Sequence, residues 1–311
     1  MPASPALAIV VNPAAGRGRA ARLVPRLRRA LGDRGIPHTL HLTTHAGHET
    51  ALARDAAASG AGTILALGGD GTWGNTVRGI MASGGTPRLA LLAAGTGNDL
   101  AFATGVPAHD LDATIALALG TAERRIDVGE VDGVHFVNCA GFGFDAEVLR
   151  ATQHVRWLRG HAVYLLTAAR KLFGYRGFDA TLAFGDGSSA WVGTAPPATE
   201  VRLHHLAVIV SNGARFGGGF IIAPGARVDD GLLDVVRIAD AQAWRRAAVF
   251  ARATRGTHTG APEVSRREAR EIFLDFDAPP LFDADGELHQ ARGTTVAVRC
   301  HPGALRLAVE G

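Results

Sequence analysis

Short apolar segments alternate with helical patterns through the first part of the chain, and this alternation limits the fold more than any other feature. Each apolar segment ends in a turn of small residues, and the stretches between the first segments have helical spacing. Strands joined by helices run parallel to one another, so the pattern predicts an α/β domain with a parallel sheet. The predicted strands are residues 7–11, 38–43, 63–67 and 89–93, and the predicted helices are 20–31 and 49–58.

Four loops follow these strands, at residues 12–18, 43–47, 68–72 and 95–99, and small and polar residues dominate all of them. The carboxyl ends of parallel strands meet at one edge of a sheet, which is where ligands bind. Any single loop could reflect the ordinary requirements of turns and helix caps. The four loops together favour a nucleotide site.

The third loop, Gly68-Gly69-Asp70-Gly71-Thr72, surrounds one carboxylate with glycines. Glycine leaves backbone N–H groups uncovered and adopts positive φ readily, which suits a cradle for phosphate oxygens. A carboxylate beside phosphates repels them unless a metal or a transferring proton mediates. The loop therefore indicates phosphoryl chemistry with a divalent cation, and magnesium (Mg2+) is the expected ion.

Two other nucleotide signatures do not fit. No Gly-x-x-x-x-Gly-Lys-[Ser/Thr] sequence occurs, and the only lysine, Lys171, is far from the glycine loops, which excludes a P-loop enzyme. Residues 16–21 resemble a dinucleotide fingerprint, but the second strand ends in Thr43-Thr44-His45 without the acidic residue that would bind a ribose. NAD binding of the Rossmann type is therefore disfavoured.

Composition bounds the remaining possibilities. The chain has 311 residues, 47% of them hydrophobic, which suffices for two domains with separate cores. Its net charge of +3 gives no reason to expect a nucleic-acid partner. Cys139 and Cys300 are too few for a disulfide framework or a zinc site, and the histidines show no paired metal-ligand spacing. Without a signal sequence or a bilayer-length apolar run, the protein is expected to be cytoplasmic, with at most peripheral contact at the inner face of the membrane.

The second half changes to a mainly β pattern from about Gly129, with a helical insert between residues 145 and 172. The predicted domains are 1–128 and 129–311, and the last strand is a candidate to pack back on the first domain. The predicted strands of the second domain are 134–138, 181–184, 206–211, 233–238, 271–275 and 295–299.

Eight short segments match a known family in their order and spacing, and they are residues 12–16, 43–47, 68–72, 95–99, 141–145, 218–224, 229–234 and 285–287. Through them the chain resembles the bacterial diacylglycerol kinase and lipid kinase family, whose catalytic domain sphingosine and ceramide kinases share. The resemblance implies a two-domain architecture of the NAD kinase and diacylglycerol kinase type. In it, an N-terminal nucleotide-binding domain and a β-sandwich-like C-terminal domain enclose a cleft where ATP meets a lipid hydroxyl.

The family pattern implies roles for individual residues. Asp285 would accept the proton of the lipid hydroxyl, with Glu287 beside it, and a positioned carboxylate is the usual base for an alcohol nucleophile in kinases. The competing interpretation is that residues 282–287 form an acidic hairpin turn. The residues implied to bind ATP are Asn12, Pro13, Ala14, Ala15, Gly16, Thr43, Gly68, Gly69, Asp70, Gly71, Thr72, Gly95, Thr96, Asn98 and Asp99.

Carboxylates also suggest where metals bind. Asp70 and Asp127 are predicted to hold the Mg2+ that neutralises the triphosphate. The resemblance implies a second, structural metal at Asp230 with the backbone carbonyls of Arg227 and Leu232, for which a plain type I turn is the alternative.

The chain departs from the family next to the glycine loop. Many members have Asn-Glu where this chain has Gly74-Asn75, so one carboxylate near the phosphates is missing. Asn75 is predicted to cap the next helix or to bond a metal-bound water.

Residues 154–173 interleave cations with large apolar side chains. This pattern suits either an anionic membrane surface or an ordinary amphipathic helix packed on the core. The hypothesis is thus an ATP-dependent lipid kinase whose lipid substrate, most simply diacylglycerol, lies at a membrane surface. Sphingosine or ceramide kinase, NAD kinase and a catalytically silent nucleotide sensor are the alternatives, and a homodimer is left open. Loop 95–99 favours the lipid branch over NAD kinases, which are expected to carry a different motif there.

Overall fold

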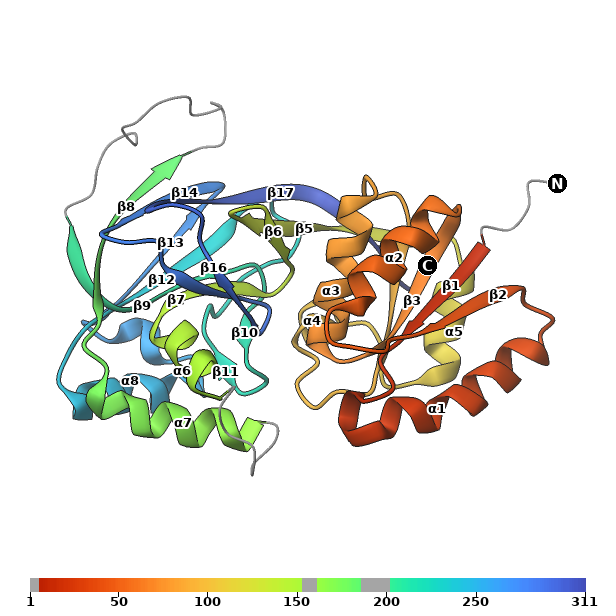
Figure 1. The fold of residues 1–311 in the computed structure, drawn as a ribbon, viewed down its shortest axis with the longest axis horizontal. Helices are drawn as coiled ribbons and strands as arrows, with labels where there is room; N and C mark the ends of the chain where they lie inside the picture. The colour runs from red at the N-terminus through yellow and green to blue at the C-terminus, as the bar shows by residue number, and fades with distance from the viewer. Residues whose placement is uncertain (1–5, 153–160, 186–201) are drawn as a thin grey trace. The chain divides into compact units, whose positions relative to one another are not determined.

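The computed structural model describes residues 6–152, 161–185 and 202–311 (Figure 1). It separates into two compact units, unit 1 with Met1–Val128 and Pro302–Gly311 and unit 2 with Gly129–His301. The chain passes between them twice, within strand β5 (Glu123–Val131) and within strand β17 (Thr295–Ala308). None of the helices in the described ranges combines the length and the apolar character that a membrane span requires.

Unit 1 contains the predicted parallel sheet, in the strand order β2-β1-β3-β4 followed by the C-terminal part of β17. The predicted strands are all present, with small changes at their ends. The strands are β1 (Ala6–Val11), β2 (His38–Leu42), β3 (Ala61–Gly68) and β4 (Arg88–Ala93).

Helices cover both faces of this sheet, which explains why its central strands read as uninterrupted apolar runs. Successive strand side chains point to opposite faces. Leu65 and Leu67 of β3 therefore lie in one core cluster with residues of α1 and α5. Helices α2 and α3 pack on each other and also on β3. The helices are α1 (Ala15–Gly32), α2 (His48–Ala58), α3 (Asp70–Ala82), α4 (Asp99–Thr104) and α5 (Leu111–Leu119).

Unit 2 is mainly antiparallel and confirms the predicted β-rich second domain. Strand β9 (Leu203–Ser211) is central, because it pairs with β7 (Cys139–Gly143), β8 (Phe178–Gly185) and β12 (Leu233–Ala239). The remaining strands are β6 (Val134–Phe136), β10 (Arg215–Phe216), β11 (Phe220–Ile221), β13 (Val264–Ala269), β14 (Glu271–Phe276), β15 (Leu281–Ala284) and β16 (Glu287–Gln290).

The alternation of β9 divides the core of unit 2 into two layers. Val208 and Val210 lie in a cluster of strand residues, whereas Ala207 and Ile209 lie in a second cluster with helical residues. Helices α6 (Phe144–Thr152), α7 (His161–Gly174) and α8 (Ala243–Ala253) lie together beside the strands (Figure 1).

Two predicted segments of the second domain have different limits in the structure. Residues 134–138 do not form one strand, since β6 ends at Phe136 and β7 begins at Cys139. The predicted helical insert is real but consists of α6 and α7, whose ends lie one residue before and two residues after the predicted limits. Residues 153–160, between these helices, lie outside the described residues.

Candidate active site

The loop after β1 has an unusual backbone. Gly16, Arg17 and Gly18 have φ values of 58°, 56° and 81°, all in the left-handed region. Gly16 also approaches the end of β4 so closely that a Cβ atom there would lie 1.8 Å from the carbonyl oxygen of Ala94. Only glycine fits at this position, so the first loop can lie directly against the start of the fourth.

Asn12 connects the first and third loops through its side chain. Its Nδ2 donates to Thr72 Oγ1 at 3.2 Å and to Glu49 Oε1 at 3.1 Å, while its Oδ1 accepts the N–H of Ala14 at 3.1 Å. Thr43 is buried and donates its N–H to the carbonyl of Val11 at 2.9 Å. The predicted nucleotide residues 12–16 and 43 thus lie in a hydrogen-bonded assembly at the ends of β1 and β2.

The third and fourth loops are joined through their backbones. The carbonyl of Gly68 accepts the N–H of Ala94 at 2.6 Å and that of Gly95 at 3.0 Å. A Cβ on Gly69 would lie 2.9 Å from the Cα of Gly95. The glycines at these positions let two strand ends approach more closely than side chains would permit.

Asp70 begins α3 and reaches across to the start of α4. One carboxylate oxygen accepts the N–H of Asn98 at 2.6 Å, and the other accepts the N–H of Leu100 at 3.3 Å. Burial raises the pKa of Asp70 above its ordinary value, and the backbone N–H bonds offset this only in part. The charged form of this carboxylate is therefore held at a cost, as expected of a group that serves a ligand.

This cost leads to a prediction for Asp70→Asn. A carboxyl group whose pKa rises on folding favours the fold below its ordinary pKa, and this contribution is lost as the pH rises through the raised pKa. An asparagine removes the charge but has one acceptor oxygen, so the N–H of Asn98 or of Leu100 loses its partner at every pH. We therefore expect the stability of the variant relative to the wild type to increase as the pH rises from about 4 to neutral. Binding of Mg2+ and ATP should weaken. Thermal unfolding across pH, beside calorimetric titration of ATP with Mg2+, measures both effects, and a stability difference that does not change with pH or an unchanged binding affinity would contradict them.

The fourth loop contains a further oxygen donor. Asn98 adopts a left-handed conformation, with φ of 58°, immediately before α4. Its Oδ1 is buried and has no hydrogen-bond partner within the described part of the chain. Thr96 is exposed and Asp99 is buried in the same loop. Oxygen donors beside Asp70 fit a hard cation such as Mg2+.

Asp127 lies in the unit 1 part of β5 and is buried. Its Oδ1 accepts the N–H of Gly303 at 2.7 Å, which ties β5 to β17. The described contact gives this carboxylate a structural role, and its role as a magnesium ligand stays a prediction.

Asp285 lies in unit 2, at the tip of the β15–β16 hairpin. Asp285 and Gly286 have φ values of 50° and 84°, the pattern of a type I′ turn, so the hairpin interpretation of this motif is correct. The carboxylate is nevertheless buried and accepts the N–H groups of Val137, Asn138 and Cys139 at 2.8, 2.8 and 3.1 Å. Three backbone donors hold it in one orientation and stabilise its charge.

Two carboxyl groups that the sequence analysis left without a role lie near Asp285. Asp283 and Asp145 are both buried and share a hydrogen bond. Burial raises the pKa of Asp283 well above its ordinary value, and the charges of Asp145 and Asp285 act in the same direction. A Cβ on Gly141 would lie 2.2 Å from Asp145 Oδ2, so the glycine makes room for this carboxyl. The motif at residues 141–145 was the available signal.

Glu287 follows this turn and begins β16, where it is half-buried and pairs in the ladder with Ala284. Its place next to Asp285 follows directly from the hairpin, and its catalytic role stays a prediction.

The predicted structural metal site has the geometry of a local turn. Asp230 is exposed and its Oδ1 accepts the N–H of Leu232 at 3.0 Å, while Gly231 has φ of 77°. Arg227 forms an ion pair with Asp229 at 3.4 Å. These contacts support the turn alternative, and metal binding here stays a prediction.

Asn75 does not cap the following helix, which corrects that prediction. It lies inside α3, is buried, and accepts a hydrogen bond from Arg78 at 2.9 Å. The neighbouring Trp73 is fully buried and donates to the carbonyl of Ala66 at 3.1 Å. Helix α3 therefore runs on without a break past the departure at Gly74-Asn75.

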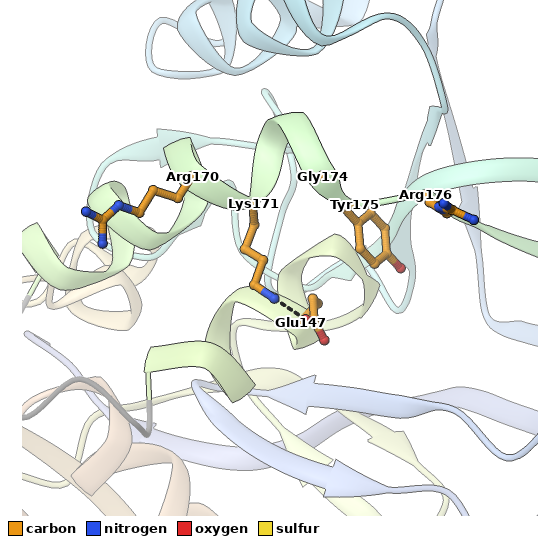
Figure 2. A pocket seen from close by; sticks show the side chains of 7 residues that line it. Glu147, Arg170, Lys171, Gly174, Tyr175 and Arg176 are labelled. Carbon is orange, nitrogen blue, oxygen red and sulfur yellow. Dashed lines mark hydrogen bonds and ion pairs between the residues drawn. The ribbon is translucent and has the colours of Figure 1, made fainter.

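Only the end of the predicted membrane stretch can be described. Residues 154–160 lie outside the described residues. In α7, Leu172 is buried in the core and Lys171 pairs with Glu147 at 2.7 Å (Figure 2), whereas Phe173 is 73% exposed. These side chains line or flank a pocket rich in cations, lined by Glu147, Arg170, Lys171, Gly174, Tyr175, Arg176 and Gly177.

Glu147, the acidic side chain of this pocket, forms two ion pairs. Glu147 binds both Lys171 and Arg150, and these contacts lower its pKa, with the Arg150 hydrogen bond the largest cause. Burial, aided by Glu147 and Asp240, raises the pKa of Tyr175 to about 12. Membrane contact stays a prediction.

An α/β unit with glycine-rich strand-end loops, followed by a β-sandwich-like unit, defines the class of diacylglycerol kinase-like two-domain proteins. Residues 6–131 match the family model described as the diacylglycerol kinase catalytic domain. Residues 138–309 match the model described as the YegS C-terminal NAD kinase beta sandwich-like domain. The chain belongs to the diacylglycerol kinase and YegS-like lipid kinase family, as the sequence resemblance predicted.

Individual relatives agree with this assignment. A Chromohalobacter salexigens protein named "Probable lipid kinase YegS-like" is 35% identical over 225 residues, covering 70% of this chain and 68% of the relative. The Bacillus subtilis protein named "Diacylglycerol kinase" is 27% identical over 280 residues, covering 90% and 88%. A crystal structure of a candidate diacylglycerol kinase from Bacillus anthracis str. Sterne superposes with a TM-score of 0.77 at 21% identity, covering 99% and 95%, and supports the fold.

Proposed function

We propose that the protein is an ATP-dependent lipid kinase that transfers the γ-phosphoryl group to the hydroxyl of diacylglycerol, giving phosphatidic acid. Membership of a lipid kinase family supports the reaction class. The observation that carries the nucleotide assignment is that the half-buried carboxylate of Asp70, in the third predicted ATP loop, accepts the backbone N–H groups of Asn98 and Leu100 at the fourth. The absence of a side chain at Gly16 and at Gly69 lets these loops approach closely, and backbone hydrogen bonds to the carbonyl of Gly68 join the third loop to the fourth.

Unit 1 would bind the nucleotide. Backbone N–H groups of residues 68–72 face the phosphates in this proposal, and Asp70 and the Asn98 oxygen are the donors suited to Mg2+. The ion, when bound, neutralises charge on the β- and γ-phosphates. Asp70 orients the start of α4 through Asn98 and Leu100 at the same time, so nucleotide binding and local structure are coupled.

Unit 2 would supply the base. The carboxylate of Asp285 is oriented by three backbone N–H groups and accepts the proton of the lipid hydroxyl as that oxygen bonds to the γ-phosphorus and the bond to the ADP oxygen breaks. Because three backbone N–H groups fix its orientation, the carboxylate of Asp285 is positioned before the lipid hydroxyl binds in this proposal.

A substrate panel tests this function. The purified protein is incubated with Mg2+ and ATP labelled at the γ-phosphate, together with diacylglycerol, sphingosine or ceramide in vesicles, or with NAD. We expect labelled phosphatidic acid and no product when Mg2+ is removed by chelation. Labelled sphingolipid would reassign the acceptor, labelled NADP would identify an NAD kinase, and ATP binding without any labelled product would support a silent sensor.

A further inference from the structure

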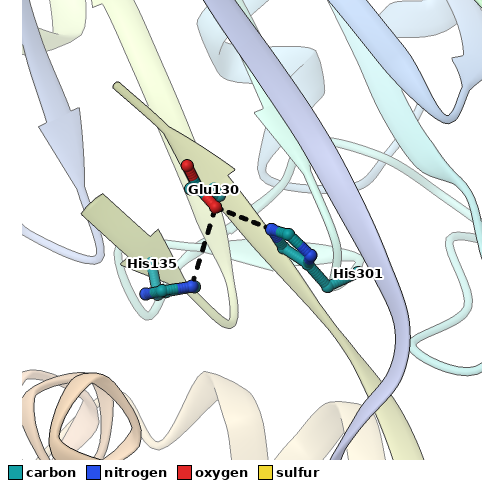
Figure 3. Close-up of side chains that lie close together, drawn as sticks. All are labelled: Glu130, His135 and His301. Carbon is teal, nitrogen blue, oxygen red and sulfur yellow. Dashed lines mark hydrogen bonds and ion pairs between the residues drawn. The ribbon is translucent and has the colours of Figure 1, made fainter. Parts of the chain in front are cut away.

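Glu130, His135 and His301 bring three metal-binding groups together on the surface of unit 2 (Figure 3). Glu130 Oε2 lies 2.7 Å from His301 Nε2 and 3.7 Å from His135 Nε2. One ligand atom from each residue lies within 4.8 Å of the other two. All three side chains are half-buried, so the cluster is accessible from solvent.

Three neighbouring strands create this cluster. Glu130 on β5 stands directly opposite His135 on β6, and directly opposed residues share a sheet face. Asp132 and Gly133, with φ of 49° and 85°, form the Asp-Gly turn that sets this register. Strand β17 pairs with β5 on its other side and contributes His301. The arrangement therefore follows from strand pairing, which local sequence spacing does not reveal.

The donor set selects a particular class of ion. Two imidazoles and one carboxylate suit Zn2+ and related transition metals, which bind these groups at about 2.0–2.2 Å. Ligand atoms around such an ion lie roughly 3.3 Å apart in tetrahedral geometry. The two distances from Glu130, 2.7 and 3.7 Å, bracket this value, and the ligand atoms of the two histidines lie within 4.8 Å of each other. Side-chain rotations that bring the three atoms to this spacing would complete the site.

The charges around the cluster allow a cation. Glu130 Oε2 and His301 Nε2 share a hydrogen bond at 2.7 Å, which a metal ion bound to both atoms would replace. Arg299 is the nearby cation, and it forms an ion pair with Glu271 at 2.6 Å. Two residues outside the cluster serve as controls for metal binding. Cys300, next to His301 in the chain, is partly buried and packs against the strand core. His204 pairs with Asp179 through Nδ1 and with Asp240 through Nε2.

We propose that Glu130, His135 and His301 bind a divalent transition metal, with Zn2+ as the reference ion, and that a water molecule takes the fourth position. The site shares no residue with the proposed kinase residues, and its existence does not depend on the lipid kinase assignment. A bound ion would cross-link β5, β6 and β17 in unit 2. Two of these strands, β5 and β17, also carry the chain between the units.

Zinc titration of the chelator-treated full-length protein tests the proposal. We expect one Zn2+ per chain by calorimetry, a higher unfolding temperature with Zn2+, and visible absorption typical of tetrahedral coordination when Co2+ replaces it. His301→Gln should weaken Zn2+ binding by about 10-fold or more, as should His135→Gln on the neighbouring strand. Using both variants guards against a single one that fails to fold.

His204→Gln and Cys300→Ser are the matched controls and should retain wild-type affinity. Absence of stoichiometric Zn2+ binding to the wild type would overturn the proposal and leave an ordinary histidine–glutamate ion pair. Equal loss of binding in the control variants would also overturn it, because the ion would then be held elsewhere. Kinase activity is not part of this readout, so its absence would bear on the proposed function alone.

Discussion

Asp285→Asn is expected to abolish phosphoryl transfer, destabilise unit 2 and leave ATP affinity nearly unchanged. The first effect follows if Asp285 accepts the proton of the lipid hydroxyl, since an amide cannot do so. The second follows from the hydrogen bonds, because an Asn side chain offers only one acceptor oxygen. Its NH2 group would face at least one of the backbone N–H groups of Val137, Asn138 and Cys139.

The expected loss of stability is about 1–3 kcal/mol for each backbone donor left without an acceptor in a buried site. Thermal and urea unfolding measure this loss, and calorimetric titration measures ATP binding. The predicted ATP residues are all in unit 1, so a folded variant should still bind nucleotide. Labelled phosphate transfer supplies the third readout.

Asp132→Asn is a control with the same turn chemistry. Asp132 also has positive φ before a glycine, but its carboxylate accepts one described backbone N–H, that of Arg292 at 2.8 Å. This variant should keep its turnover and lose little stability, because Asn-Gly suits a type I′ turn. If Asp285→Asn turned over at the wild-type rate while folded, Asp285 would be a structural residue only.

Gly16→Ala is expected to disrupt the nucleotide loops more severely than any single change of a polar residue there. An alanine at this position must adopt left-handed φ, which costs about 1–2 kcal/mol. Its Cβ would also lie 1.8 Å from the Ala94 carbonyl, so the first and fourth loops must separate. Such overpacking adds about 1–3 kcal/mol. We expect a lower unfolding temperature and ATP affinity reduced by at least about 10-fold, equivalent to 1.4 kcal/mol.

Gly18→Ala separates backbone strain from the clash. Gly18 has φ of 81°, but its Cβ would meet only Arg22 Nη1, at 3.7 Å. The variant should therefore lose about 1–2 kcal/mol and retain most of its ATP affinity. Comparable losses in the two variants would show that left-handed strain alone explains the effect and that the contact with Ala94 is unimportant.

Much of unit 1 could be predicted because its signals are local. Apolar segments separated by helical spacing predicted β1 to β4, and glycine clusters marked the loops after them. Helix α8 was not predicted, although it places Val249 and Ala253 on its buried face between arginines. The pattern of this helix was misleading, because Trp244 is exposed while Arg246 is buried. The break between β6 and β7 was also missed, since Val137 and Asn138 continue the strand-like pattern of their neighbours.

The candidate site also contains residues that a local motif predicts and contacts that depend on strand pairing. Asp70 and Asp285 could be singled out because each stands in a short, distinctive motif. Asp145 also stands in a motif, at residues 141–145, but its coupling to Asp283 could not be predicted, because it depends on the pairing of strands β7 and β15 and on the space left at Gly141. The prediction for Asn75 failed because a residue's position inside or outside a helix depends on how far that helix continues.

The sequence by itself determined the α/β and β-rich order, the four glycine-rich loops and membership of the lipid kinase family. Turn chemistry and side-chain periodicity act over a few residues, and the sequence displays them directly. Only the tertiary structure decided that Asp285 bonds Val137, 148 positions away, and that Glu130 meets His301, 171 positions away. Such contacts depend on which strands pair and on the register between them, and both arise from burying apolar faces across the whole unit.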